Sequence, residues 1–236
     1  MGRGMSDILA IIPAFNEEGA VGKVVEEIRR LRPAVDVVVI DDGSTDETAD
    51  VARKAGARVI SLPFNLGIGG AVQTGFKYAT EKGYDVAVQV DGDGQHRPDQ
   101  IPILLDALRQ EGIDVVIGSR FLSSGGYTTS LVRRIGVHVF VLVNSILLKR
   151  RITDNTSGFR AYNRKAIEFL AEHYPYDYPE PESVIILGRN GFRLAEVPVL
   201  MREREHGRSS ISAFWSMYYM IKVLLAIFMT LFKKYR

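Results

Sequence analysis

Short apolar runs rich in Val and Ile alternate with longer amphipathic segments along the first half of the chain. The apolar runs are nearly continuous, which is typical of β-strands covered on both faces of a sheet. Strands that alternate with helices predict an α/β fold with a mostly parallel, Rossmann-like sheet and right-handed crossovers. The predicted strands are residues 8–13, 35–40, 57–62, 86–90 and 115–117, with a last strand at 192–200.

Four segments between these strands have the pattern of helices. The first shows the spacing of an amphipathic helix. Its apolar face is formed by Val21, Val24, Val25, Ile28 and Leu31. Residues 44–47 read Ser-Thr-Asp-Glu, which predicts a capping box at the start of the second helix. Residues 67–82 and 99–110 predict the third and the fourth.

The pattern changes after residue 119. Residues 121–130 are rich in Ser, Gly and Thr and predict a loop. Residues 131–148 predict an apolar helix that is too short to span a bilayer cleanly. Residues 174–181, rich in Tyr and Pro, predict a rigid loop.

The segment 211–232 is almost entirely apolar and contains one charged residue, Lys222. Its polar and small residues recur every three or four positions and so form one narrow helical stripe. Such a helix can lie in a membrane interface, span the bilayer or pack on another subunit, although the central Lys disfavours a span. We therefore expect an α/β domain over 6–210 and a C-terminal amphipathic or membrane-associated helix over 211–236.

Composition and charge narrow the class of protein. The chain has 236 residues, 46% of them apolar, and a net charge of +2, which excludes intrinsic disorder. It has no cysteine, which excludes disulfide frameworks, thiol catalysis and cysteine–zinc sites. The first six residues do not resemble a secretory signal. Seven Lys and Arg against two Glu between residues 201 and 236 favour an anionic membrane surface over nucleic acid.

Two carboxylates directly follow the predicted strand 86–90. Glycines follow both Asp91 and Asp93, so one turn can aim both side chains at the same point. With the amide oxygen of Gln95 they form a set of hard oxygen ligands that suits Mg²⁺ or Mn²⁺ and not zinc. Asp-Gly is also common in solvated turns, but open α/β sheets bind ligands at the carboxyl ends of their strands.

Two further strand ends carry groups that suit a nucleotide. Asp42 can accept a hydrogen bond from a base or a ribose, with a helix N-cap as the alternative. Phe15 offers a stacking face and Glu17 an acceptor, with a plain strand-to-helix turn as the alternative. Residues 65–71 are Gly-rich but lack the spacing of a dinucleotide-binding fold, so we expect them to let a helix and a nucleotide approach closely.

Arginines supply candidate phosphate ligands, because a guanidinium group can donate paired hydrogen bonds to a phosphate. Arg120 follows the strand 115–117. The other candidates are Arg133, Arg134, Arg160, Arg202, Arg204 and Arg208. His96 adjoins the two carboxylates and is either a phosphate contact or an exposed loop residue.

Five motifs occur in order between residues 13 and 120. They are Pro-Ala-Phe-Asn-Glu-Glu, Val-Val-Val-Ile-Asp-Asp-Gly-Ser-Thr-Asp, Asn-x-Gly-x-Gly-Gly-Ala, Asp-Gly-Asp-Gly-Gln-His and Gly-Ser-Arg. Together they resemble the family-2 glycosyltransferases, which have the GT-A fold. Residues 154–160 and the later Gly-Arg-Ser-Ser are similar to the dolichol-phosphate mannose synthase branch and its bacterial polyprenol-phosphate relatives.

The resemblance implies a role for each matching residue. Asp91, Asp93 and Gln95 would bind a divalent cation, Mg²⁺ or Mn²⁺, that bridges the donor diphosphate. Arg120 and Arg133 would receive the acceptor phosphate and, with Asp93, carry the catalysis. The donor nucleotide would be held by Pro13, Ala14, Phe15, Glu17, Asp42 and Asp91, with Arg204 and Ser209 closing over its diphosphate.

The reaction implied by the resemblance is an inverting, metal-dependent transfer of a sugar from a nucleotide sugar to a polyprenyl or dolichyl phosphate, by default mannose from GDP-mannose. A phosphate acceptor is already anionic and needs no general base. The alternatives are transfer from a UDP-sugar or to a hydroxyl acceptor in cell-envelope polysaccharide synthesis, and a nucleotide-sugar-binding module without turnover. We expect a protein at the cytoplasmic face of the membrane, peripheral or held by one helix, with a homo-oligomer or a separate membrane protein as alternative assemblies.

Overall fold

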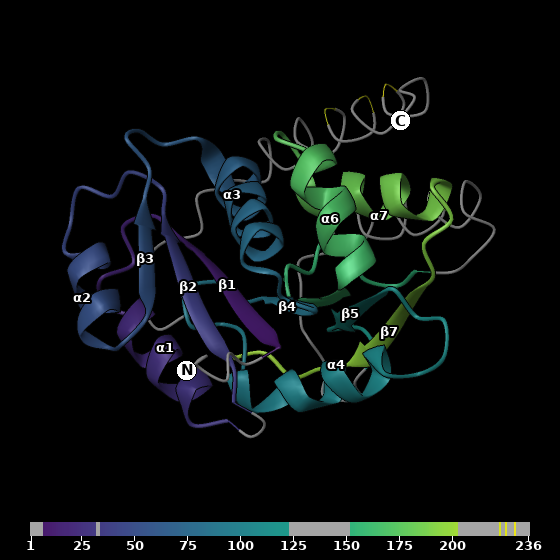
Figure 1. Ribbon diagram of the computed structural model, residues 1–236, viewed down its shortest axis with the longest axis horizontal. Helices are drawn as coiled ribbons and strands as arrows, with labels where there is room; N and C mark the ends of the chain where they lie inside the picture. The colour runs from purple at the N-terminus through teal and green to yellow at the C-terminus, as the bar shows by residue number, and fades with distance from the viewer. Residues whose placement is uncertain are drawn as a thin grey trace.

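A seven-stranded sheet forms the centre of the protein (Figure 1). The computed structural model describes residues 7–31, 34–122 and 152–202, together with Lys222, Leu225 and Met229. The strand order is β3-β2-β1-β4-β6-β5-β7. Strand β6 pairs antiparallel with β4 and β5, and the other pairs are parallel. The prediction of a mostly parallel sheet is therefore confirmed.

Strands and helices alternate along the chain much as the apolar pattern predicts. The strands are β1 Ile8–Ala14, β2 Asp36–Asp41, β3 Arg58–Ser61, β4 Val86–Gln89, β5 Val115–Ser119, β6 Arg160–Asn163 and β7 Leu194–Pro198. The helices are α1 Val21–Arg29, α2 Thr48–Lys54, α3 Gly67–Lys82, α4 Ile101–Leu108, α6 Arg164–His173 and α7 Pro179–Arg189, with a 3₁₀ turn η1 at Pro98–Gln100. All six predicted strands are present, and the fourth predicted helix is η1 followed by α4.

Helices cover both faces of the sheet (Figure 1). Along β1, Ile8, Ala10 and Ile12 pack into the core shared with α1 and α4, whereas Leu9 and Ile11 pack into the core shared with α3, α6 and α7. Fully burying a side chain of this size stabilises a fold by about 1.5–3 kcal/mol. Burial on both faces explains why the strands read as continuous apolar runs.

Helix α3 lies unusually close to its neighbours, and glycines make this approach possible. A Cβ at Gly75 would lie 2.2 Å from Ile11 Cγ2 in β1, and a Cβ at Gly69 would lie 2.4 Å from the carbonyl oxygen of Pro175. These two glycines therefore let α3 pack closely against β1 and against the loop at Pro175. At the start of the same helix, Gly67 lines the cleft described below.

Two local predictions are wrong. No capping box opens α2, because Ser44 Oγ accepts a hydrogen bond from the Asn16 N–H at 3.0 Å, while Asp46 Oδ1 accepts from the Thr48 N–H at 3.0 Å. Residues 174–181 are not a loop throughout, because α7 begins at Pro179. Proline suits the first helical turn, where its missing N–H leaves no bond unmade.

The apolar pattern missed the strand β6 and the helices α6 and α7. Strand β6 has four residues, Arg-Ala-Tyr-Asn, which is too short and too polar to show an apolar run. Helix α6 follows it at once, capped by Asn163 Oδ1, which accepts from the Ala166 N–H at 3.0 Å. Because β6 is antiparallel, its first residue, Arg160, lies at the same edge of the sheet as the carboxyl ends of β4 and β5.

The predicted helix at 131–148 and most of the predicted loop at 121–130 lie outside the described residues. The same holds for the segment 211–236, except that Lys222, Leu225 and Met229 are helical and exposed. In the part of the chain that the structure describes, no helix is both long enough and apolar enough to cross a bilayer.

Candidate active site

A cleft of about 320 Å³ opens at the carboxyl edge of the sheet, where β1, β2 and β4 end. It brings together the residues predicted at three separate strand ends: Pro13, Ala14, Phe15, Glu17, Asp42, Asp91 and Asp93. The start of α3 lines it as well, and Glu180 enters from α7. Among the described residues, Gln95 is not part of this lining. We call this region the acidic cleft, because five of its lining residues are Asp or Glu.

The loop after β1 is held against the loop after β2. Asn16 has a φ of 56°, a left-handed conformation that Asn tolerates better than most residues. Its Oδ1 accepts from the Thr45 N–H at 2.9 Å. The Glu17 N–H donates to Thr48 Oγ1 at 2.8 Å. These bonds fix the positions from which Phe15 and Glu17 reach the cleft.

Asp42 joins the end of β2 to the start of α3. Its side chain is buried, and Oδ1 accepts from the Leu66 N–H at 2.7 Å. Burial raises the pKa of Asp42, and the hydrogen bonds from the Leu66 and Gly67 N–H groups oppose that rise in part. The residue therefore holds the β3–α3 loop in place as well as lining the cleft.

Asp91 and Asp93 both line the cleft, as predicted. The turn that carries them is fixed by His96, whose Nδ1 accepts from the Asp91 N–H at 2.9 Å. His96 is buried and stacked on Phe159, with ring centroids 5.0 Å apart. Burial lowers the pKa of His96 to about 4, so the ring is neutral at pH 7. The histidine is thus a buried structural residue.

The contacts of Gln95 at this site are made by its backbone, and its predicted role as a metal ligand stays a prediction. Its backbone N–H donates to Asp93 Oδ1 at 3.0 Å, and its carbonyl oxygen accepts from the Arg202 N–H at 2.8 Å. Through these bonds Gln95 orients the carboxylate of Asp93. Within the described residues, no group of three or more His, Asp or Glu side chains is arranged to hold a metal ion.

The residues around Asp91 nevertheless fit a magnesium-type ion. Mg²⁺ commonly takes one or two carboxylates and completes its shell with water and substrate phosphates, and the cleft offers Asp91 and Asp93. A Cβ at Gly158 would lie 3.1 Å from Asp91 Oδ1 and 3.2 Å from Gln89 Nε2. That Nε2 is buried and makes no hydrogen bond in the described part of the chain. Gly158 therefore keeps space open beside the carboxylate.

Glu180 is a cleft residue that the sequence did not reveal. Burial raises the pKa of its carboxyl group, and nearby Arg160 opposes the rise. Its carbonyl oxygen accepts from Arg160 Nη2 at 3.0 Å. Arg160 itself is buried and also donates to Ser157 O at 2.7 Å and Ser183 Oγ at 2.8 Å. Arg160, predicted as a phosphate ligand, instead holds α7 against the loop before β6.

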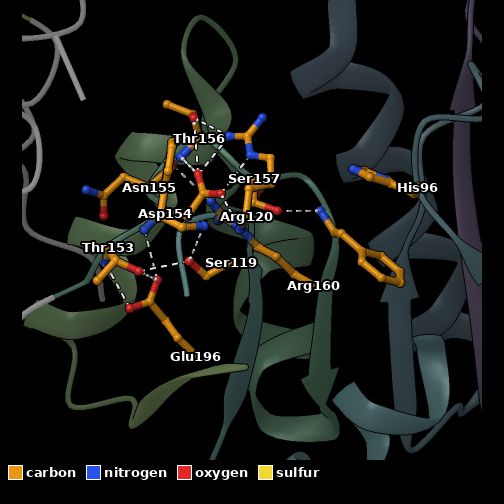
Figure 2. Close-up of polar contacts among 12 residues, drawn as sticks. His96, Ser119, Arg120, Thr153, Asp154, Asn155, Thr156, Ser157, Arg160 and Glu196 are labelled. Carbon is orange, nitrogen blue, oxygen red and sulfur yellow. Dashed lines mark hydrogen bonds and ion pairs between the residues drawn. The ribbon is translucent and has the colours of Figure 1, made fainter. Parts of the chain in front are cut away.

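Arg120 is held by the loop that precedes β6 (Figure 2). Its Nε and Nη2 donate to the two carboxylate oxygens of Asp154, each at 2.7 Å, and Nη2 also donates to Thr156 Oγ1 at 2.6 Å. Asp154 is fully buried. Burial would raise the pKa of Asp154, but the hydrogen bonds and charge of Arg120 lower it below its usual value. The pair is therefore ionised and rigid.

Glu196 of β7 supports this pair from beneath (Figure 2). Its carboxylate accepts from the N–H groups of Thr153 at 2.8 Å and Asp154 at 2.9 Å. Burial raises the pKa of Glu196, and these backbone bonds oppose the rise. We call Arg120, Asp154, Glu196 and Arg160 with their partners the paired cluster. Five candidate ligands lie outside the described residues: Arg133, Arg134, Arg204, Arg208 and Ser209.

Sequence comparison identifies the chain's relatives. The family model for Glycosyl transferase family 2 matches residues 9–170. An undecaprenyl-phosphate mannosyltransferase of Micrococcus luteus is 36% identical over 217 residues, which cover 87% of each chain. A polyprenol monophosphomannose synthase of Mycolicibacterium smegmatis is 33% identical over 86% of this chain and 80% of its own.

A solved structure shares the overall fold of this chain. The structure of glucosyl-3-phosphoglycerate synthase from Mycobacterium tuberculosis in complex with Mg²⁺ and uridine diphosphate matches with a TM-score of 0.69 and 25% identity. The match covers 93% of this chain and 78% of that one.

Proposed function

Since the chain belongs to glycosyl transferase family 2 and is a glycosyltransferase, we propose that it transfers a sugar from a nucleotide sugar to a polyprenyl phosphate. We propose mannose from GDP-mannose as the donor, with inversion at the anomeric carbon and with Mg²⁺ or Mn²⁺ required. The two relatives that act on an undecaprenyl phosphate or make polyprenol monophosphomannose support this acceptor class. We place the reaction at the cytoplasmic face of a membrane.

One observation carries the proposal: Asp91 and Asp93 meet the nucleotide-side residues of β1 and β2 in a single cleft. A nucleoside diphosphate is itself anionic, so it binds beside two carboxylates only when positive charge lies between them. Asp91 and Asp93 would hold that charge as a divalent cation. When bound there, the cation would supply Lewis-acid stabilisation to the diphosphate as it leaves.

The remaining roles follow from where the side chains lie. Phe15 offers an exposed ring to the base, and Glu17 and Asp42 offer acceptors to the base or the ribose. We propose that Arg120, held in one orientation by Asp154, receives the acceptor phosphate together with Arg133. Arg204 and Ser209 would close over the donor diphosphate.

The acceptor phosphate attacks the anomeric carbon directly, so no proton needs to be removed. The phosphate is already ionised near pH 7 and acts as its own nucleophile. One displacement on the face opposite the leaving group inverts the anomeric centre. What the protein must supply is orientation of the two anions and stabilisation of the negative charge on the departing diphosphate.

The test is a matrix of donors and acceptors. GDP-mannose, GDP-glucose, UDP-glucose and UDP-N-acetylglucosamine are each incubated with an undecaprenyl phosphate, a dolichyl phosphate and a hydroxyl-bearing glycoside. We expect a lipid-phosphate product with GDP-mannose that requires Mg²⁺ or Mn²⁺ and is abolished by excess chelator.

Three other outcomes would contradict the proposal. Product with hydroxyl acceptors alone would make the protein a polysaccharide-type transferase. Saturable binding of a nucleotide sugar without product would make it a binding module. Transfer that is unaffected by chelator would remove the proposed role of Asp91 and Asp93.

A further inference from the structure

Exposed apolar side chains gather at one edge of the protein. In residues 7–31, 34–122 and 152–202, all the exposed large hydrophobic residues except Ile103 follow the carboxyl end of a strand or lie in a loop at that edge. Phe64 and Tyr176 are the most exposed of them, each at 63%. Isolated exposed hydrophobics are normal on a protein surface, but their concentration at one edge is not.

Four of these residues lie at or beside the acidic cleft. Ile68 lines the cleft itself. The remaining three lie beside the start of α3. A Cβ at Gly69 would lie 2.7 Å from Tyr176 Cα, so the loop of Tyr176 contacts this helix. We call Phe64, Leu66, Ile68 and Tyr176 the apolar rim; Phe15, inside the cleft, is left to the base of the nucleotide.

The loop that carries Phe64 and Leu66 is held by two hydrogen bonds. Asp42 accepts from the Leu66 N–H, and Asn65 Oδ1 accepts from the Gly67 N–H at 2.9 Å. Phe64 and Leu66 belong to neither hydrophobic core. The fold therefore holds these side chains toward solvent at a fixed position, and their apolar character contributes little to packing.

We propose that the apolar rim inserts into the interfacial layer of a lipid bilayer and so places the acidic cleft at the membrane surface. This inference rests on the proposed function, because a polyprenyl phosphate carries its phosphate at the surface of a bilayer. The cleft must then open within reach of that surface, and the rim borders its mouth. Phenylalanine, tyrosine, leucine and isoleucine are side chains that enter the interfacial layer readily.

A bilayer explains this surface better than a protein partner does. A protein seated on the rim would cover the mouth of the cleft that the lipid acceptor has to reach. The C-terminal residues Leu225 and Met229 also favour lipid. Both are helical, and their side chains are 58% and 62% exposed. Residues four apart share one face of a helix, so the C-terminal segment also exposes apolar side chains.

The experiment measures binding of the full chain to vesicles of phosphatidylcholine, without donor or acceptor. Phosphatidylcholine is zwitterionic, so the basic C-terminal residues add little attraction. The double variant Phe64→Ser/Tyr176→Ser is compared with Ile103→Ser, whose side chain is 43% exposed on α4. We expect the double variant to partition at least tenfold more weakly than the wild type, and Ile103→Ser to match the wild type.

Several results would overturn the inference. Unchanged partitioning of a folded double variant, or an equal loss in Ile103→Ser, would do so. A self-association of the wild type that the double variant abolishes while vesicle binding persists would assign the rim to a second copy. Thermal unfolding of each variant, matching the wild type, shows that the comparison is between folded proteins.

Activity provides the second readout and separates this inference from the proposed function. Transfer to a short, water-soluble polyprenyl phosphate should be unchanged in the double variant, whereas transfer to a long-chain acceptor in vesicles should fall about tenfold. An equal fall with both acceptors would show that the substitutions act on the cleft and would overturn docking. Vesicle binding without any transfer in the wild type would refute the proposed function alone.

Discussion

The two halves of the carboxyl edge of the sheet differ in how their charged side chains are arranged: one gathers acidic residues, and the other pairs arginines with acceptors. The acidic cleft, at the ends of β1, β2 and β4, collects five Asp and Glu residues, and no Lys or Arg stands among its described lining residues. In the paired cluster, beside β5 and β6, Arg120 donates to both carboxylate oxygens of Asp154. Arg160 donates to three backbone carbonyl oxygens and to Ser183 Oγ.

The difference distinguishes a region that gathers charges of one sign from a region where the protein pairs opposite charges. Like charges held together destabilise a fold unless a ligand compensates them, which is why we propose a cation in the acidic cleft. A buried charge that is fully hydrogen-bonded needs no ligand. Arg160 therefore shapes the site, since it holds the helix that carries Glu180, whereas Arg120 is the member of the paired cluster for which we propose a ligand, the acceptor phosphate. Four substitutions test this division.

The largest effect is expected from Arg160→Met. This change removes the donor from four acceptors, in three hydrogen bonds that are buried and one that is partly buried. Breaking a buried charged network costs about 3–5 kcal/mol. The free energy of unfolding, measured by urea titration, should fall by that amount. As a control, Arg109→Met removes only the exposed pair with Asp106, for which we expect less than about 1 kcal/mol. Similar losses in the two variants would contradict the structural role of Arg160.

Asp93→Asn should abolish most transfer while leaving the fold intact. The amide keeps the size of the side chain but loses the charge that would hold the divalent cation, and even residues behind a metal ligand change affinity or activity by about 10–100-fold. We expect kcat/KM to fall by more than about 100-fold.

The control for that variant is Asp99→Asn, which breaks the Arg97–Asp99 pair outside the cleft and should remain active. Unfolding curves of the two variants should coincide with that of the wild type. Full activity in Asp93→Asn would show that the acidic cleft does not bind the cation through this residue.

Tyr162→Phe should reduce the sensitivity of the fold to alkali. Burial raises the pKa of Tyr162 to about 12, with Arg160 opposing the rise. In the unfolded chain the phenol ionises near pH 10. The stability that the buried, protonated phenol contributes to the fold is therefore complete below pH 10 and is lost as the pH rises toward 12. The total loss is about 2–3 kcal/mol.

This alkaline loss is measured as unfolding free energy at pH 9 and pH 11. The variant should lose less stability between these values than the wild type, although Tyr174, whose pKa is also raised by burial, keeps part of the dependence. Tyr176→Phe, at an exposed position, should behave as the wild type. If stability falls between pH 9 and pH 11 by the same amount in Tyr162→Phe as in the wild type, the raised pKa of Tyr162 is refuted.

The smallest effect is expected from Gly158→Ala. The added methyl would lie 3.1 Å from Asp91 Oδ1, a contact that forces the carboxylate to shift by a few tenths of an ångström. We expect the concentration of Mn²⁺ that gives half-maximal rate to rise several-fold, with the KM for the lipid acceptor unchanged. A rise in the acceptor KM alone would place Gly158 at the acceptor side of the site.

Several features of this site could be predicted from local sequence. The strands are visible because burial on both faces demands runs of apolar residues. Once those strands are parallel, the polar residues that follow them must meet at one edge. For that reason Phe15, Glu17, Asp42, Asp91 and Asp93 could be assigned to one cleft before their positions were known, and they do line one.

The local sequence determined the six parallel strands and the meeting point of their ends, because the spacing of apolar residues is a property of short segments. It did not determine which charges are paired. Arg120 and Asp154 are 34 residues apart, and Arg160 and Ser183 are 23 apart. The antiparallel β6 and the helix that begins at Pro179 create those contacts and bring Glu180 to the cleft. Whether an arginine binds a ligand or holds the fold depends on such distant partners and on burial, which only the tertiary structure decides.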